Sequence, residues 1–352
     1  MTTTSNGTDH HAALSVDPDL VAMMNAVFAD QRKSGPAAAP ITRDAGLWQR
    51  LDELGLVRLT GREESGGSAA GWPEAAELMA AAVRHRIRIP LAEHDLLACW
   101  LLDVVGLPAD GAARTICVLG HDGTAHHVPW ASTADRVVVV WPTGIHYYAA
   151  DLDVSDPAVQ ITQGTNMIGE PRDSISADLT ALAGTPVAAG QLTQLKLKSA
   201  LVRSIQVCAA LDRILELTIE HTSSRAQFGR SLSKFQAVQN MVADIAAEAA
   251  LARAATEAAL TAAVQSAWSA PNLKFLVAVA RSCTGHATSV VVRNAHQACG
   301  AIGTTMEHRL HEYTRPALTW RSEFGSVQSW DAVVTDAARC VGSRGLWSLI
   351  AD

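Results

Sequence analysis

The sequence predicts a mainly α-helical protein with an N-terminal helical domain, a small middle β-domain and a C-terminal four-helix bundle. Apolar residues make up 48% of the chain and aromatic residues only 5%, and most of the apolar residues are Ala, Leu and Val. This composition favours packed helices over a β-sandwich or barrel. In addition, the hydrophobic period changes along the chain from helical to strand-like and back.

Residues 17–112 are predicted to form the N-terminal helical domain. Two runs of apolar residues recur there at helical spacing. They are Leu20, Met23, Met24 and Val27, and then Leu47, Leu51, Leu54 and Leu56. Gly55 is suited to end the second helix, and Pro73 is suited to the first turn of a third. Residues 1–16 are expected to be a loose tail.

Residues 113–188 are predicted to form a reduced middle β-domain. Three short segments, 114–119, 135–141 and 145–149, are rich in β-branched or aromatic residues and are bounded by Gly, Pro or Asp. These are the features of strands.

Residues 189–352 return to the helical period and are predicted to form the bundle. One stripe consists of Leu201, Ile205, Cys208, Leu211, Leu215 and Ile219, and another of Phe235, Val238, Met241 and Ile245. A further long helix is expected over 274–297. Long helices with wide apolar faces and short connections are typical of a four-helix-type bundle.

Charge and cysteine usage exclude several classes of protein. The 28 Lys and Arg residues against 35 Asp and Glu give a net charge of −7, which argues against a chain that coats nucleic acid or anionic membranes. The six cysteines are single, and the histidines lack metal-ligand spacing, so we expect no metal site and reduced thiols. We find no secretory signal or membrane-spanning stretch and expect a cytoplasmic location.

The first candidate motif is the run 225–229, Arg-Ala-Gln-Phe-Gly, followed by Phe235, Gln236 and Gln239. The helical pattern ends near Thr222, so Arg225 lies between two long helices. A guanidinium group beside helix-terminal amides suits a pyrophosphate. Alternatively, Arg225 caps the carbonyl groups of the preceding helix.

Two more motifs follow in the bundle. Residues 296–303, His-Gln-Ala-Cys-Gly-Ala-Ile-Gly, let a ligand or another backbone approach closely, although paired glycines also mark a simple turn. Residues 313–326 bring an Arg, a Trp and Glu323 together before Gly325-Ser326. The alternative there is a solvated helix face with Trp320 as its core anchor.

These three motifs, in this order and at these separations, resemble the C-terminal bundle of the acyl-CoA dehydrogenase family. The segments 47–56 and 128–136 resemble that family's N-terminal domain and the edge of its middle domain. The resemblance extends from about residue 45, and the helix–strand–helix order agrees with it.

The resemblance implies FAD as the cofactor. Its pyrophosphate and adenosine end would be held by Arg225, Gln227, Phe228 and Gln236, with Gln297, Gly300 and Ala301 contacting the same moiety. In the family these contacts are made to the flavin of a neighbouring subunit, so a homo- or hetero-oligomer, at least a dimer, is implied.

The resemblance also implies α,β-dehydrogenation of an acyl-CoA thioester, with electrons passing to an acceptor such as an electron-transfer flavoprotein. The family's base is a carboxylate in an apolar site, where desolvation raises its pKa. In the family the base lies about 21 residues after the last glycine of the second motif. Counting from Gly303 reaches Phe324, one residue beyond Glu323. Glu323 is therefore the predicted base, and Glu307 is a weaker candidate. Ser326 would replace the threonine that contacts the flavin. Some family members carry the base on the first helix of the bundle, but that position is Ser199 here, which cannot act as the base.

The middle domain departs from the family pattern. The Thr- and Ser-rich acidic stretch and the Trp-x-Thr strand that enclose the flavin ring are absent between residues 105 and 190. Two functions therefore remain open: an FAD-dependent acyl-CoA dehydrogenase, or a non-catalytic subunit of a heteromeric one that completes its partner's FAD site.

Overall fold

The N-terminal part of the computed structural model is helical. The structure describes residues 15–32 and 41–351, so most of the predicted tail, residues 1–14, lies outside the described residues. The helices are α1 (Pro18–Arg32), α2 (Ala45–Glu53), α3 (Trp72–Arg84) and α4 (Trp100–Val105), with a π-helix over Ala92–Cys99 directly before α4. Asp44 caps α2 by accepting a hydrogen bond of 3.0 Å from the backbone N–H of Leu47.

Two small sheets form the middle of the chain. Their strands are β1 (Arg114–Val118), β2 (Thr124–Pro129), β3 (Arg136–Thr143), β4 (His146–Asp153), β5 (Val159–Thr162), β6 (Arg172–Ala177) and β7 (Thr185–Val187). One sheet has the order β1-β3-β4-β7 and the other β2-β6-β5, and only the β1–β3 pair is parallel. The three predicted strands correspond to β1, β3 and β4. The other four were not predicted, because they are short or carry many polar residues.

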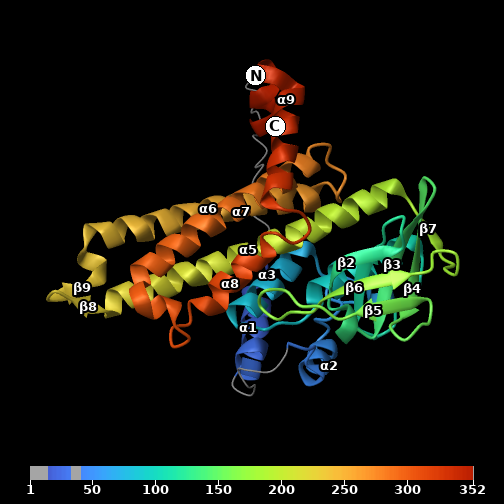
Figure 1. The fold of residues 1–352 in the computed structure, drawn as a ribbon, viewed down its shortest axis with the longest axis horizontal. Coiled ribbons are helices and arrows are strands. Elements are labelled where there is room, and N and C mark those ends of the chain that lie inside the picture. The colour runs from blue at the N-terminus through green and yellow to red at the C-terminus, as the bar shows by residue number, and fades with distance from the viewer. Residues whose placement is uncertain (1–14, 33–40, 352) are drawn as a thin grey trace, which may run out of the picture.

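Three long antiparallel helices dominate the C-terminal part (Figure 1). They are α5 (Ala189–Ser224), α6 (Gln236–Gln265) and α7 (Leu273–Cys299), followed by the shorter α8 (His311–Trp320). A short hairpin joins α5 to α6 at the end of the bundle that points away from the sheets. Its two strands, β8 (Ala226–Gln227) and β9 (Arg230–Ser231), have two residues each. The helix α5 runs from this hairpin to the sheets, so it connects both ends of the molecule.

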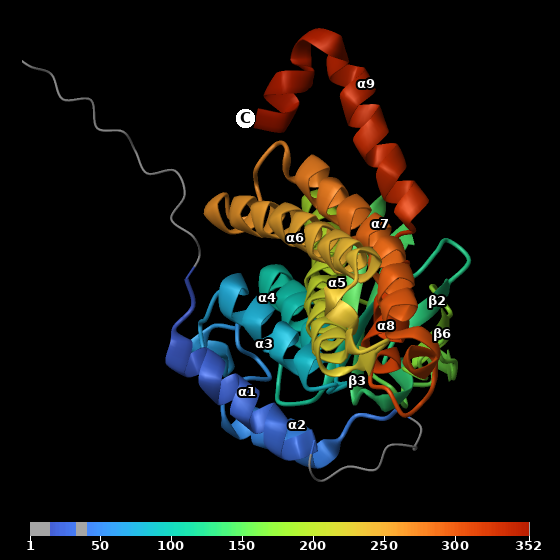
Figure 2. The same cartoon turned by 90° about the vertical axis from the view of Figure 1, so that its left-hand side faces the viewer.

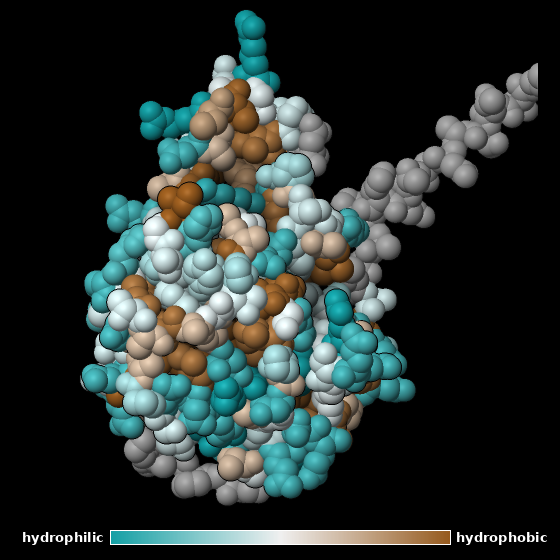
Figure 3. Space-filling view, turned by 90° about the vertical axis from the view of Figure 1, so that its right-hand side faces the viewer, coloured by the Kyte–Doolittle hydropathy of each residue, from teal (hydrophilic) through white to brown (hydrophobic). Residues whose placement is uncertain are grey.

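The last helix, α9 (Val327–Ala351), leaves the bundle, which the sequence did not predict (Figure 2). Asp331 anchors its first half to α7, by accepting a hydrogen bond of 2.7 Å from Ser282 and lying 3.0 Å from Nε2 of His286. A kink at Gly342 reverses the second half, where Trp347 is 76% and Ile350 63% exposed. Figure 3 shows hydrophobic side chains along this projecting arm.

The sequence predicts no membrane-spanning stretch, but helix α7 lies in a segment that meets the length and composition criteria for one. An 18-residue window within Leu273–Thr304 has a mean hydropathy of 1.4, so this segment is long and apolar enough to cross a membrane by length and composition alone. However, α7 lies against α5, α6 and α9, and buried Arg281 lies within it. The core helix of a bundle has the same composition, so we assign α7 to the core.

The ammonium group of Lys198, on α5, is enclosed by three tryptophans. Its Nζ lies 3.8 Å from the ring centroid of Trp268, 4.6 Å from that of Trp100 and 4.8 Å from that of Trp72. Because these rings come from the α6–α7 turn, α4 and α3, the cage joins the N-terminal helices to the bundle. Burial lowers the pKa of Lys198 to about 7, while the indole faces favour the charged form.

We expect the Lys198→Met variant to lose part of the pH dependence of stability. The pKa of Lys198 in the folded protein, about 7, lies below its ordinary value of 10.5. The unfolded chain therefore binds more protons between these values. As a result, the free energy of unfolding of the wild type should rise over this range, relative to the variant, by at most about 1.4 kcal/mol per pH unit.

Urea unfolding at pH 7 and pH 9 measures this difference. Lys196→Met is the matched control, because Lys196 is exposed on the same helix; it should keep the wild-type dependence. Equal pH dependences in the wild type and Lys198→Met would contradict the prediction.

Candidate functional site

The β8–β9 hairpin carries the first predicted motif. Helix α5 ends at Ser224, and Arg225 follows in an extended conformation. Turn residues Phe228 and Gly229 have φ values of 52° and 80°, and Phe228 is 91% exposed. The guanidinium group of Arg225 is exposed and has no hydrogen-bond or ion-pair partner among the residues that the structure describes. The alternative role of this side chain, as a cap on the carbonyl groups of α5, is therefore not observed.

The charge of this hairpin suits an anion. Arg225, Arg230 and Lys234 all lie between residues 225 and 236, and this stretch contains no acidic residue. The guanidinium of Arg230 stacks 4.2 Å from the ring centroid of Phe235, whereas that of Arg225 remains available. An available guanidinium group with exposed backbone amides fits a diphosphate.

The second predicted motif lies at the same end of the bundle. Helix α7 ends at Cys299, and Gly300 has φ 66° and ψ −152°, a conformation that favours glycine. The rings of His221, on α5, and His308, after this loop, lie 5.1 Å apart and join the two segments. The structure thus gathers the predicted nucleotide-binding residues at one end of the molecule, all of them exposed: Arg225, Gln227, Phe228, Gln236, Gln297, Gly300 and Ala301.

Glu323 lies in the turn between α8 and α9, and its carboxylate is bound by two arginines. Oε1 accepts hydrogen bonds from Nε of Arg172 at 2.8 Å and from Nδ2 of Asn166 at 3.1 Å. Oε2 accepts from Nη2 of Arg172 at 2.9 Å and from Nε of Arg203 at 2.7 Å. Burial raises the pKa of Glu323, but the charges of Arg203 and Arg172 and these hydrogen bonds outweigh it and lower the pKa to about 2.

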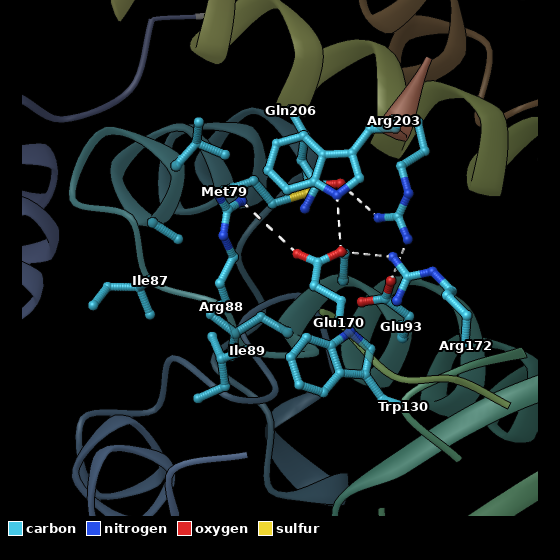
Figure 4. A pocket seen from close by; sticks show the side chains of 15 residues that line it. Met79, Ile87, Arg88, Ile89, Glu93, Trp130, Glu170, Arg172, Arg203 and Gln206 are labelled. Atoms are coloured by element: carbon cyan, nitrogen blue, oxygen red, sulfur yellow. Dashed lines mark hydrogen bonds and ion pairs between the residues drawn. The ribbon is translucent and has the colours of Figure 1, made fainter. Parts of the chain in front are cut away.

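Arg172 and Arg203 belong to a larger buried ionic network, and Figure 4 shows its part around Glu170 and Glu93. Arg203 also donates to Glu93 at 2.7 Å, and Arg172 to Glu170 at 2.9 Å. Glu170 accepts a further hydrogen bond of 3.1 Å from the indole of Trp320 and lies 3.8 Å from Arg88. Three guanidinium groups thus face three carboxylates, which leaves the network close to neutral. Buried charges are tolerated when they are paired in this way.

Arg281 fixes the turn that presents Glu323. Its buried guanidinium donates to the backbone carbonyl oxygens of Arg321 at 2.9 Å and Glu323 at 2.8 Å. Phe324 follows with φ 54°, and its ring lies 5.0 Å from the guanidinium of Arg203. The turn therefore directs Glu323 into the ionic network and Phe324 against Arg203.

A cavity of about 910 Å³ lies beside this turn, between strands β1 and β2 and helix α5. Glu323, Phe324 and Ser199 line it. Ser326 does not; its hydroxyl instead accepts a hydrogen bond of 3.1 Å from the backbone N–H of Ser329 and so caps α9. The structure thus gives Ser326 a local role and does not place it at the cavity.

The two parts of the predicted site are far apart within one chain. Arg203, which contacts Glu323, precedes Arg225 by about 22 residues of continuous helix, which is roughly 33 Å. Arg225 and Glu323 of the same chain therefore lie toward opposite ends of α5. Glu307 is exposed and lies near the end of the bundle that contains Arg225, since the neighbouring His308 packs against His221 there.

Comparison with known proteins identifies the family. The model of the acyl-CoA dehydrogenase C-terminal domain matches residues 183–329. The chain is also 28% identical over 304 residues to acyl-CoA dehydrogenase IpdE2 of Mycobacterium tuberculosis, covering 81% of this chain and 86% of that protein. Residues 183–329 thus match the C-terminal domain of the acyl-CoA dehydrogenases, and most of the chain is similar to a member of that family. The prediction of an oxidoreductase family that acts on acyl-CoA, with FAD as its cofactor, is therefore confirmed.

Solved structures confirm the predicted fold of this chain. The ChsE4-ChsE5 complex from Mycobacterium tuberculosis matches with a TM-score of 0.78 and 19% identity, covering 92% of this chain and 97% of that chain. Butyryl-CoA dehydrogenase from Megasphaera elsdenii matches with a TM-score of 0.74 and 16% identity, covering 92% and 99%.

Sequence reasoning did not find the partners of Glu323. Arg172 and Arg203 precede it by 151 and 120 residues, so no local pattern links them. One signal was present: Arg203 interrupts the apolar stretch 200–211 of a helix that is buried nearly all round. A charged residue in such a position requires a buried partner.

We expect the Glu323→Gln variant to be strongly destabilised, because it leaves Arg172 and Arg203 with unbalanced buried charge. The free energy of unfolding should fall by about 3–5 kcal/mol, as measured by denaturant unfolding. Glu307→Gln, at an exposed position, is the control and should change it by less than about 0.5 kcal/mol.

The same pairing sets the acid sensitivity of the wild type. Since the pKa of Glu323 lies near 2 rather than at its ordinary 4.5, its contribution is present at neutral pH and is lost as the pH falls from about 4.5 toward 2. A Glu323→Gln protein as stable as the wild type would show that the network does not hold the fold.

Proposed function

We propose that this chain is the accessory subunit of a hetero-oligomeric, FAD-dependent acyl-CoA dehydrogenase. It holds the ADP half of the FAD whose ring is used by a catalytic partner chain. The partner supplies the base, and this chain completes the cofactor site. We further propose that the assembly is cytoplasmic.

This proposal rests on the carboxylate of Glu323, whose hydrogen-bond acceptor positions are all in use. A carboxylate offers about four lone-pair positions, and four hydrogen bonds already fill those of Glu323. An efficient general base has a pKa near the working pH, whereas the pKa of Glu323 is about 2. In this arrangement Glu323 is a structural ion-pair partner, which argues against its predicted role as the base.

The opposite end of the bundle supports the accessory role. The diphosphate of FAD fits the unpaired Arg225 and the acid-free hairpin around it. Exposed apolar side chains surround these polar groups: Phe228 is 91%, Met306 77% and Ile302 41% exposed. Large apolar side chains next to a polar ligand site indicate a surface that a second subunit covers.

The chemistry of the assembly follows from its cofactor. When bound, FAD would supply the acceptor for the hydride from the β-carbon of the acyl-CoA, and the base of the partner chain would take the α-proton. This chain's residues bind and orient the nucleotide end. We propose that electrons then pass to an acceptor such as an electron-transfer flavoprotein. Because one structural relative is described as a steroid acyl-CoA dehydrogenase, we propose lipid or steroid catabolism as the setting.

The competing function is a self-sufficient dehydrogenase in which Glu323 is the base. The cavity of about 910 Å³ beside Glu323 favours it. This function requires Arg172 and Arg203 to release the carboxylate when substrate binds, at the cost of breaking two buried ion pairs.

Expression of the chain alone and together with complete acyl-CoA dehydrogenase chains of the same organism tests the proposal. We expect a colourless protein alone, and in the assembly a visible flavin spectrum that acyl-CoA bleaches. A chain that is yellow when purified alone and is bleached by acyl-CoA would instead support the self-sufficient enzyme.

In the assembly, Arg225→Ala should weaken FAD binding by about tenfold to hundredfold, because a charge-assisted hydrogen bond is lost. Fluorescence titration of the assembly after flavin removal measures the dissociation constant. Arg62→Ala is the control, since Arg62 is exposed in the N-terminal domain and pairs with the exposed Glu64. Unchanged FAD binding in Arg225→Ala would contradict the role of the hairpin.

A further inference from the structure

Two histidines stand beside Arg225 at the end of the bundle. His221 lies in the last turn of α5. The backbone N–H of Arg225, the residue directly after this helix, donates to the carbonyl of His221 at 2.9 Å. The ring of His308 packs edge-on against that of His221 at 5.1 Å. Both rings are partly exposed.

Both imidazoles have a nitrogen that is free to bind a ligand. Nδ1 of His308 accepts a hydrogen bond of 3.1 Å from the backbone N–H of Leu310, so the proton of the neutral ring is on Nε2. That Nε2–H, and both ring nitrogens of His221, have no hydrogen-bond partner within the described part of the chain. By contrast, His296 lies 3.3 Å from the hydroxyl of Thr314, and His311 lies 2.8 Å from the carbonyl of His308.

Four titratable or charged groups face these two rings. They are Glu220 from α5, Arg225 directly after α5, His296 from α7, and His311 from the start of α8. Glu220 is the one acid among them, and it is exposed. Burial lowers the pKa of both rings; the charge of Arg225 lowers that of His221 further, and the neighbouring histidines lower that of His308. Without a bound anion, both rings are therefore mainly neutral at pH 7.

We propose that His221 and His308 join Arg225 in binding the diphosphate of the shared FAD. This inference rests on the proposed function. The chemistry is that of a diphosphate-bearing nucleotide: its oxygens accept hydrogen bonds from the guanidinium and from the imidazole N–H groups. Its negative charge favours protonation of both rings.

Binding of FAD should therefore depend on pH. If the diphosphate raises the pKa of an imidazole by one unit, the affinity for FAD rises about tenfold as the pH falls through the titration of that ring. The expected direction is tighter binding at pH 5.5 than at pH 8. The assembly would thus hold its cofactor most firmly under mildly acidic conditions.

Titration of the flavin-free assembly with FAD between pH 5.5 and pH 8, followed by flavin fluorescence, tests this inference. The double variant His221→Gln/His308→Gln should bind FAD with a much smaller pH dependence than the wild type. His146→Gln is the matched control, because His146 is exposed on the β3–β4 hairpin at the other end of the molecule, and it should keep the wild-type dependence.

Two further measurements separate charge from folding. His308→Lys carries a permanent charge, so it should bind FAD more tightly than the wild type at pH 8 and respond less to pH. Riboflavin, which has no phosphate, should bind the wild type and the double variant with the same affinity. A defect in folding would lower both affinities.

The outcomes distinguish this inference from the proposed function. Equal pH dependences in the wild type and the double glutamine variant would overturn the role of the histidines. If Arg225→Ala still weakened FAD binding, the shared cofactor site would stand without them. If Arg225→Ala had no effect either, the proposed function itself would fail.

Discussion

The Glu323 carboxylate and the two guanidinium groups that bind it lie where three parts of the fold meet. Arg172 begins a strand of the middle sheets, Arg203 lies within the long helix α5, and Glu323 lies in the turn before α9. Each charge alone would be costly in the interior, so the three stabilise the fold only together. The position of the sheets relative to the bundle depends on this pairing.

The pairing has a direct chemical consequence. A catalytic carboxylate must remain poorly solvated and poorly paired, so that its pKa is high enough to accept a proton from carbon. A structural carboxylate requires the opposite, because full pairing is what makes its burial tolerable. Glu323 meets the second requirement. One carboxylate cannot be both fully paired and free to accept a proton. The hydrogen bonds from Arg172 and Arg203 make Glu323 a fully paired, structural carboxylate.

The features that the sequence predicted are those with local or periodic signals. The long helices follow from apolar residues at helical spacing, and Arg225 was found because it interrupts that pattern between two of them. Strands such as β2, with its exposed His126 and His127, lack a clear alternation and were not predicted. The state of Glu323 could not be predicted, because it depends on arginines more than a hundred residues away and on a turn that Arg281 holds from another helix.

The length of α5 separates two functions along one rigid element. The end near the sheets contains the ionic network, and the end near the hairpin contains the exposed residues that are predicted to bind the nucleotide. We expect substitutions at one end to leave the other end's geometry intact. After a gene duplication, one copy can therefore lose its proton-abstracting group while selection preserves its cofactor contacts. Two copies then become mutually dependent, and neither can be lost from the genome without the other becoming useless.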